Sequence, residues 1–413
     1  MTAPRPERDL DLVVHGATGF TGRLVARGVR DRAPAGLRWG LSGRNEAKLR
    51  RIRDELGLDP QRVPVIVADA FDSAALAALA GRARAVVTTV GPYARYGRQL
   101  VAACALAGTD LADLTGEPLF MRDTILLHHA TARATGARIV HACGFDSVPS
   151  DLGAYALQRE AVRRHGRPCR EVVHLFGPLS GGVSGGTIAS LFDLADLVAN
   201  DPDARRALQD PDLLAPGGSP SRPAPWGLPP ARHDGFAGWS APFVMAATNE
   251  KVVRRSRFLR GEPWGPEVRY VERFAAATWA RAAAVGLGTV ALMALLAVPP
   301  LRRLAARLAP KPGAGPSDRT RADGFFRTTL IGRVPDVSEP IVAHVRADED
   351  PGYAATARML AEFGLLLAAG ESDAEGGVLT PAVAGGARAI ERLAEVGIEI
   401  RVEPPAGSPT RVP

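Results

Sequence analysis

The sequence predicts an α/β fold in which an N-terminal, doubly wound parallel sheet is followed by a second, α+β domain. Strand-like and helix-like segments alternate over residues 10–165, which is typical of a parallel sheet covered by helices on both faces. A glycine-rich turn joins the first strand to the first helix. Beyond residue 165 the alternation stops, and 413 residues is long for one domain. We therefore assign residues 166–402 to a second domain for substrate binding or dimerisation.

The composition is that of a core-forming protein, with 46% apolar and 23% charged residues. The 51 basic residues exceed the 44 acidic ones, but no basic stretch alternates with aromatic residues, so we expect no nucleic-acid partner. Cys104, Cys143 and Cys169 are far apart and odd in number, which predicts a cytoplasmic location rather than a disulfide framework. Residues 1–9, which lack the apolar segment of a secretory signal, and residues 403–413 are expected to be tails.

The first strand, "LDLVV" at 10–14, leads into "GATGFTG" at 16–22 and then into a helix with apolar residues at helical spacing. In such a turn Gly16 permits the tight bend, Gly19 lets backbone N–H groups approach a pyrophosphate, and Gly22 lets the helix pack against the strand. The helix N-terminus adds unpaired donors and a partial positive charge. We predict that this loop binds a dinucleotide through Gly16, Thr18, Gly19, Phe20, Thr21 and Gly22. The alternative is a strand–helix turn without a ligand.

The second strand and the turn after it, "LRWGLSGRNEAKL" at 37–49, predict which dinucleotide is bound. An enzyme that uses NAD carries an Asp or Glu at the end of this strand for the ribose hydroxyl, and none stands here. Arg offers a planar fork that suits a 2′-phosphate. The turn therefore favours NADP(H), with Ser42, Arg44, Asn45 and Lys48 as its contacts. An ordinary solvated Arg44 is the alternative.

Further strands of the predicted sheet are expected at 63–69, within 83–97, within 108–117 and within 136–153. The third ends in Asp69, placed to meet the adenine, and the fourth ends in Val90, Gly91, Pro92 and Tyr93. Ligands of doubly wound sheets lie beyond the carboxyl ends of the strands, where all these residues fall. The sequence thus predicts a Rossmann domain with a dinucleotide at this edge.

Six side chains near the nicotinamide end are candidates for the chemistry: Tyr93, Tyr96, Glu117, His141, Cys143 and Asp146. We name Tyr93 as the catalytic candidate, because its hydroxyl could polarise a carbonyl or donate a proton. Its ring could equally serve as a platform for the nicotinamide. Glu117 is expected to be structural, and Asp146 with Ser147 to cap the following helix. No set of His, Cys and Asp has the spacing of metal ligands.

"GATGFTG", "LSGRNEAKL", "VGPYARYG", "DLADLTGE" and "CGFDSVPSDLG", in this order, resemble the saccharopine dehydrogenase family, and more narrowly its trans-acting enoyl reductase branch. "GGVSGGT", "EDPGYAATARMLAEFGLLL" and "GGVLTPA" resemble the same branch. The resemblance implies an NADP-dependent oxidoreductase that reduces a carbon–carbon double bond of a polyketide or lipid intermediate carried by a separate synthase. Its alternatives are a saccharopine-type amine or imine oxidoreductase and a non-catalytic NADP-binding protein at a lipid surface.

The second domain is expected to begin with a strand and a helix within 171–200, where Ser184 to Thr187 line the substrate pocket or, alternatively, Thr187 caps the helix. The Pro- and Gly-rich stretch at 210–235 predicts a surface loop or lid. Two strands follow at 325–334 and 340–348, and then a helix with Pro351 in its first turn.

Residues 282–298 carry no charge, and Arg302, Arg303 and Arg307 follow them. A full membrane crossing would separate the later strands from the sheet they should join. We therefore expect a helix that is buried in the core, lies in a homodimer interface, or dips into one leaflet. The last case predicts peripheral membrane contact through 282–308.

Overall fold

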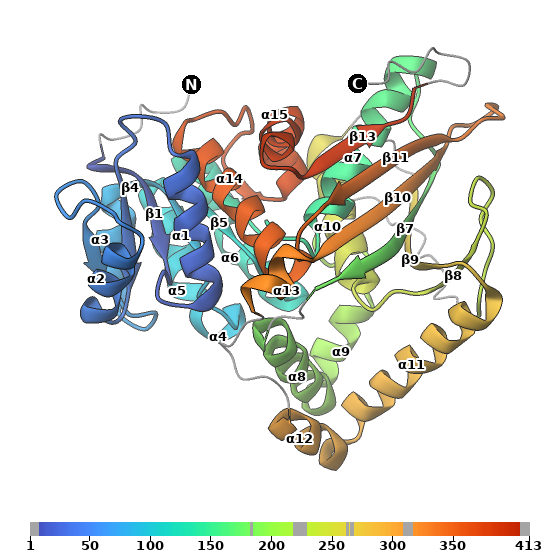
Figure 1. Ribbon diagram of the computed structural model, residues 1–413, viewed down its shortest axis with the longest axis horizontal. Helices are drawn as coiled ribbons and strands as arrows, with labels where there is room; N and C mark the ends of the chain where they lie inside the picture. The colour runs from blue at the N-terminus through green and yellow to red at the C-terminus, as the bar shows by residue number, and fades with distance from the viewer. Residues whose placement is uncertain are drawn as a thin grey trace.

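The computed structural model describes residues 8–181, 185–217, 229–261, 264, 268–308 and 317–404, and it contains two β-sheets side by side (Figure 1). The first sheet is parallel and seven-stranded, with the order β12-β6-β5-β4-β1-β2-β3, and the second is mixed and six-stranded, with the order β13-β11-β10-β7-β9-β8. The predicted α/β class, with a parallel sheet followed by an α+β part, is confirmed.

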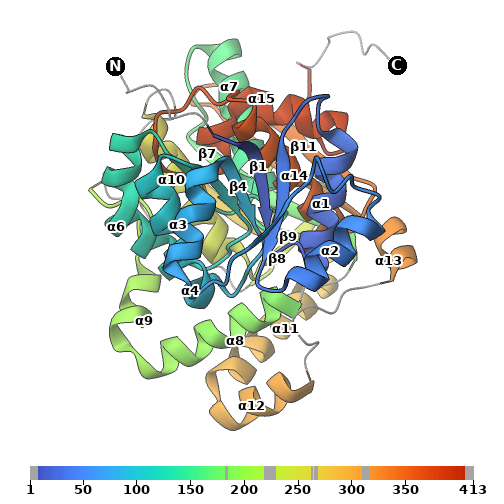
Figure 2. The ribbon, with the colours of Figure 1, turned by 90° about the vertical axis from the view of Figure 1, so that its left-hand side faces the viewer.

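The central strands of the first sheet are buried on both faces, because helices cover each side (Figure 2), whereas the edge strand β3 is partly exposed. Leu12 and Val14 pack with α1 and α14, whereas Val13 between them packs with α3 and α5. The strands are β1 (Leu10–His15), β2 (Trp39–Gly43), β3 (Val65–Val67), β4 (Ala83–Thr88), β5 (Asp110–Asp113), β6 (Arg138–Val140) and β12 (Gly377–Leu379). The helices are α1 (Phe20–Arg32), α2 (Glu46–Glu55), α3 (Ser73–Arg82), α4 (Tyr93–Tyr96), α5 (Arg98–Ala107), α6 (Pro118–Thr135) and α14 (Thr356–Ala368).

The last strand of the first sheet, β12, comes from the far end of the chain and was not expected from the sequence pattern. It pairs with β6 in parallel, and the Val378 N–H donates to Nδ1 of His129 on α6 at 3.0 Å. A domain boundary at residue 165 therefore lies close to the start of the second sheet, but it assigns β12 to the second domain although this strand belongs to the first sheet.

The second sheet is built by β7 (Glu171–Ser180), β8 (Trp239–Pro242), β9 (Arg269–Ala276), β10 (Phe325–Arg333), β11 (Ile341–Ala347) and β13 (Glu399–Val402). The predicted strands at 171, 325 and 340 are present, and Pro351 is in the first turn of the π-helix η1 (Pro351–Ala355), as expected. Helix α7 (Val148–His165) packs on β10, β11 and β13 and also on α15 (Pro381–Glu395), which contacts α14 of the first sheet. Thus α7 and α15 connect the two sheets.

A buried carboxylate fixes where three helices meet. Asp151 in α7 is fully buried and accepts hydrogen bonds from the Ser256 hydroxyl in α10 (Ala246–Arg260) and from the Ala382 N–H at the start of α15, the latter at 2.7 Å. Burial raises the pKa of Asp151 to about 6. The N-terminal part of α7 is therefore held in one position relative to both sheets.

A set of helices extends away from the sheets, at the bottom of Figure 1: α8 (Gly185–Asn200), α9 (Pro202–Gln209), α11 (Trp279–Ala297) and α12 (Pro299–Leu308). Helix α13 (Asp318–Ala322) precedes β10. Helix α8 begins two residues before the predicted Thr187, and the predicted pocket residue Ser184 lies outside the described residues. The predicted loop at 210–235 is described only outside 218–228.

Helix α11 is long and apolar enough to cross a membrane by length and composition, yet only 17% of its apolar window is buried. Of the three expectations for this segment, the buried core helix is wrong.

Helix α1 lies unusually close to the end of β1. A Cβ on Gly22 would lie 2.1 Å from the Gly16 carbonyl oxygen and 2.8 Å from its carbon, atoms of the backbone that cannot rotate away. Only glycine fits there, as the sequence predicted for helix–strand packing.

Replacing Gly22 with Ala should lower the free energy of unfolding by about 1–3 kcal/mol, because α1 must move away from the sheet. Urea denaturation without cofactor measures this. Gly288→Ala in exposed α11 is the matched control: its added Cβ has no neighbour within 4 Å, so stability should stay level or rise slightly. Equal denaturation midpoints for both variants would contradict the close contact.

Candidate active site

The glycine loop forms an open cradle at the carboxyl end of β1. Gly16 has a φ of +86°, and a Cβ on it would lie 2.7 Å from Val90 Cγ2. Gly19 is the N-cap of α1, and no side chain caps this helix or places an acidic group in its first turn. The first-turn N–H groups thus face outward beside a partial positive charge, which fits a pyrophosphate.

The residues predicted to contact a 2′-phosphate divide into two pairs. Arg44 and Lys48 are exposed, and in the described part of the chain neither side chain has an ion-pair or hydrogen-bond partner. Asn45 caps α2, since its side chain accepts from the Lys48 N–H at 2.9 Å. Ser42 is fully buried and its hydroxyl lies 3.0 Å from Nδ1 of His15. The hydroxyl of Ser42 therefore points inward, away from the position predicted for it.

His15 at the end of β1 was not singled out from the sequence. It is buried behind the cradle, and burial lowers its pKa to about 4, so the ring is neutral at physiological pH. Its partner Ser42 also accepts two backbone hydrogen bonds at its carbonyl, from Gly16 and Ala17. This pair therefore supports the cradle from behind; an isolated His in a strand gave no sequence pattern that could reveal it.

Asp69, predicted to meet the adenine, is partly buried and accepts from the Phe71 N–H at 2.9 Å in the turn after β3. Thr18 and Thr21 are partly exposed around the cradle. Phe20 packs edge-on against Tyr353 of η1, with ring centroids 5.0 Å apart, and the Arg321 guanidinium lies 5.2 Å above its ring. Phe20 thus joins the cradle to the second part of the chain.

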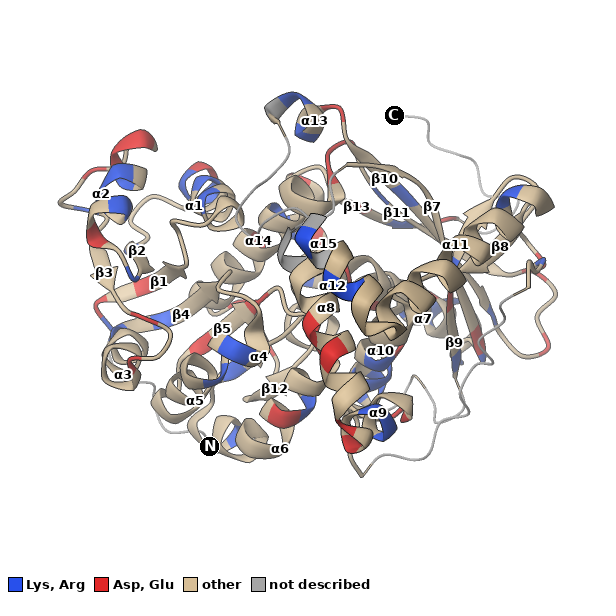
Figure 3. Cartoon of the chain, turned by 90° about the horizontal axis from the view of Figure 1, so that it is seen from below, with Lys and Arg blue, Asp and Glu red and all other residues tan. Residues whose placement is uncertain are grey.

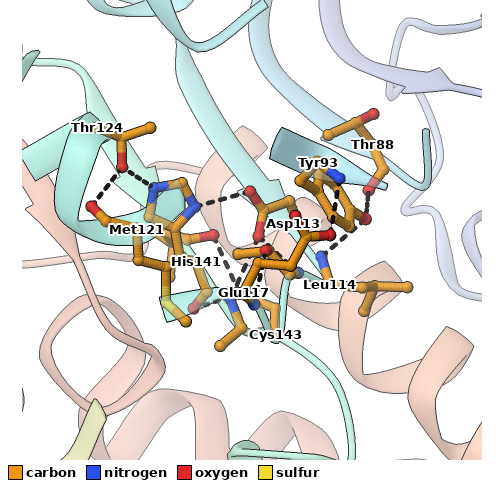
Figure 4. A network of polar contacts seen from close by, with 12 residues as sticks. Thr88, Tyr93, Asp113, Leu114, Glu117, Met121, Thr124, His141 and Cys143 are labelled. Atoms are coloured by element: carbon orange, nitrogen blue, oxygen red, sulfur yellow. Dashed lines mark hydrogen bonds and ion pairs between the residues drawn. The ribbon is translucent and has the colours of Figure 1, made fainter. Parts of the chain in front are cut away.

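At the end of β4 the chain turns through Val90, Gly91 and Pro92 into α4, whose first residue is Tyr93 (Figure 4). The Tyr93 hydroxyl donates to the Thr88 carbonyl and accepts from the Leu114 N–H, each at 3.1 Å. Burial raises its pKa well above the ordinary value. This hydroxyl already bridges β4 and β5, which suits a wall of the site better than proton transfer; its catalytic role stays a prediction.

Glu117 has the structural role expected of it. One carboxylate oxygen accepts from the Tyr93 N–H at 2.9 Å and the other from the Ala94 N–H at 2.8 Å, so that Glu117 caps the start of α4. It also accepts from the Ser190 hydroxyl of α8 at 2.8 Å. Glu117 thus connects α8 to the nicotinamide end of the sheet.

His141 and Cys143 lie in a buried network below the site (Figure 4). The two ring nitrogens of His141 contact the Asp113 carboxylate and the Thr124 hydroxyl, both at 2.7 Å. Cys143 is fully buried, and burial raises its pKa well above the ordinary value. These groups hold β5, β6 and α6 together and face no solvent.

Of the two residues expected to cap α7, Ser147 is at the N-cap position, but neither its side chain nor that of Asp146 bonds a helix N–H. The N-cap is Ser147, whose hydroxyl contacts Asn249 at 2.9 Å instead of a helix N–H. Among the described residues Asp146 has no hydrogen-bond partner, and its Oδ2 lies 4.0 Å from the position of a Cβ on Gly116. The Met245 methyl lies 3.9 Å from the same position. Desolvation raises the pKa of this partly exposed carboxyl group to about 6.

Aromatic side chains of the second sheet gather around Phe145, the residue before Asp146. The ring centroids of Phe145 and Phe326 are 4.7 Å apart, and Phe176 stacks on Phe243 at 4.1 Å. These Phe residues are far apart in the sequence and formed no pattern by which sequence reasoning could have grouped them. Phe176 and Phe326 are fully buried, so this cluster packs the second sheet against the segment that follows β6.

A separate cleft of about 260 Å³ lies between α6 and the α8–α9 pair. Its two arginines, Arg98 and Arg122, are paired with Asp123 at 2.8 and 2.6 Å. Because Asp201 and Asp203 line the cleft together with Asp123, its carboxylates outnumber its arginines, and it offers an anionic cofactor little attraction compared with the cradle.

No protein-family model matches the chain. A Mycobacterium tuberculosis protein with the provisional name trans-acting enoyl reductase Rv2449c is 44% identical over 95% of this chain and 97% of its own. The trans-acting enoyl reductase of Mycobacterium leprae is 40% identical over 95% and 98%. Apo saccharopine dehydrogenase (L-Glu forming) of Saccharomyces cerevisiae has a similar fold, with a TM-score of 0.50, 13% identity, and coverage of 95% of this chain and 99% of that one. Given the identity along nearly the full length of both mycobacterial proteins, this chain belongs to the trans-acting enoyl reductase family, on a saccharopine dehydrogenase fold.

Proposed function

We propose that the protein is an NADPH-dependent enoyl reductase, which reduces a carbon–carbon double bond of an acyl chain carried by a separate synthase. The observation that carries this proposal is the 44% identity to a protein named for that activity, over nearly the whole of both chains. The cradle supports it, since its uncapped helix start and glycine contacts fit a dinucleotide. A bound nicotinamide would supply the hydride.

The choice of NADPH over NADH rests on the turn after β2. Arg44 and Lys48 are exposed cations without a partner in the described part of the chain, and no carboxylate stands at the strand end. A 2′-phosphate there would gain charge-assisted hydrogen bonds, whereas a ribose hydroxyl would lack its usual carboxylate.

Reduction of an enoyl group needs a proton as well as a hydride, and we assign the proton to Asp146. Its carboxyl group is partly exposed, lies beyond β5 and β6, and has no other partner among the described residues. In the reaction the O–H bond of Asp146 breaks as a C–H bond forms on the carbon that does not receive the hydride, and solvent returns the proton afterwards.

The word "trans-acting" in the names of the relatives supports a partner synthase that holds the substrate. We infer a cytoplasmic location for this chain. The support is that Cys104, Cys143 and Cys169 are all free and buried.

Replacing Arg44 with Ala should weaken NADPH binding by about 1.5–3 kcal/mol, the scale of a charge-assisted hydrogen bond, and leave NADH binding nearly unchanged. Titration followed by nicotinamide fluorescence measures both. Arg50→Ala removes a nearby Arg that already pairs with Glu46, and it should change neither affinity. An equal loss of both cofactors in Arg44→Ala would rule out the 2′-phosphate contact.

Asp146→Asn should lower the turnover of an enoyl thioester by about 10²–10⁴-fold while NADPH binding persists, because the amide cannot donate a proton. Since only the protonated carboxyl group donates and its pKa is about 6, wild-type kcat/KM should fall as the pH rises through that value, and the variant should not show this step. Tyr93→Phe is the comparison. If Tyr93→Phe loses turnover and Asp146→Asn does not, Tyr93 is the donor and our assignment is wrong.

The reaction class is tested by offering enoyl thioesters and saccharopine to the same protein with the reduced and oxidised cofactor. We expect cofactor oxidation with the enoyl thioester only. Turnover of saccharopine would favour an amine oxidoreductase, and tight cofactor binding without turnover of either would favour a non-catalytic protein.

A further inference from the structure

Helices α11 and α12, residues 279–308, form an arm whose outer surface is apolar and exposed. Leu287 is 73% exposed, and large side chains continue along both helices at Trp279, Val290, Met293, Leu301 and Leu304. In α12, Leu301 and Leu304 lie one turn apart on the same exposed stripe. A contiguous surface of this kind marks an interaction site.

The arm itself carries only basic charged residues. Between Glu272 and Asp318 the sequence contains no acidic residue, while it contains five arginines and one lysine. Arg281, Arg303 and Arg307 are exposed, and Figure 3 shows basic segments on α12 beside a mostly uncharged α11. The surface therefore complements a partner that is apolar inside and anionic at its boundary.

The sheet topology decides how a membrane could meet this arm. Strand β9 precedes α11 and β10 follows α12, and both pair with β7 in the same sheet. A crossing by α11 would place β9 and β10 on opposite sides of the bilayer. With 19 residues and a length of about 28 Å, the helix can instead lie flat along a surface.

We propose that the arm docks in the plane of an anionic phospholipid bilayer, with the apolar side chains among the acyl chains and Arg281, Arg303 and Arg307 at the headgroups. An acidic protein surface would pair with the arginines, but it would not bury the apolar side chains that extend along the 19 residues of α11. The surface of an anionic bilayer can accommodate both the apolar side chains and the arginines.

The arm is joined to the active site through α8. Helix α8 packs against α11 and α12, and Arg302 of α12 pairs with Asp196 of α8. On the same helix, Ser190 bonds Glu117, which holds the start of α4. A docked arm would thus bring the nicotinamide end of the site near the membrane, where a long acyl substrate would be accessible. This goes beyond the reductase activity and does not depend on the substrate.

Co-sedimentation of the full-length protein with vesicles tests the proposal. We expect little binding to phosphatidylcholine alone, and at least about tenfold more when half of it is replaced by phosphatidylglycerol, with loss of the increase at high salt. Leu287→Asp combined with Leu301→Asp should abolish binding. The matched control is Leu126→Asp combined with Leu127→Asp on α6. These two leucines are 64% and 65% exposed but lie outside the arm, so this variant should bind vesicles as the wild type does.

Arm variants should reduce a short, water-soluble enoyl thioester at the wild-type rate, so loss of docking and loss of catalysis can be told apart. Absence of binding to either vesicle would overturn the proposal. So would a wild-type dimer that becomes monomeric in the arm variant without any vesicle binding, because the arm would then be an interface between two copies. Binding of the arm to a synthase but not to vesicles would also overturn it.

Discussion

The buried carboxylate of Asp151 is the interaction on which the relative placement of the two sheets depends. It accepts hydrogen bonds from α10 and from the first turn of α15, while its own helix, α7, packs on the second sheet. Burying a carboxylate is costly, and the pKa raised to about 6 reflects that cost, which is greatest above this pH, where the group must be charged in both states. In return, the hydrogen bonds of Asp151 fix the position of α7. Because α7 begins beside the site, they also fix the positions of Asp146 and Ser147, which directly precede the helix.

Two carboxylates near the start of the same helix thus have opposite environments. Asp151 is enclosed and bonded to two neighbouring helices, to α10 through Ser256 and to the start of α15 through Thr380 and Ala382, whereas Asp146 has no bonded partner in the described part of the chain and faces Gly116. Desolvation raises both pKa values to about 6, yet only the unpaired group is free to exchange a proton with a ligand. The other polar groups at this edge, on Tyr93, Glu117 and His141, are engaged in holding strands and helices.

In the arm formed by α11 and α12, large apolar side chains are exposed, whereas in the sheets they are buried. Exposed Leu and Met side chains contribute no burial to folding, so they are explained better by a partner than by stability. Because α8 contacts the arm on one side and Glu117 on the other, whatever covers the arm can influence the site through one helix. The arm and the site are therefore connected by packing rather than by sequence proximity.

By itself the sequence determined the parallel sheet, the glycine cradle and the exposed Arg44, because strand runs, glycine spacing and the absence of a carboxylate are local patterns. It also located the apolar helix and the strands that exclude a crossing. Only the tertiary structure decided that β12 returns to the first sheet, that Ser42 turns inward to His15, that Asp146 is unpaired and that α11 is exposed. Each of these depends on which distant segment lies next to a residue, and burial and hydrogen-bond partners are set by those non-local contacts.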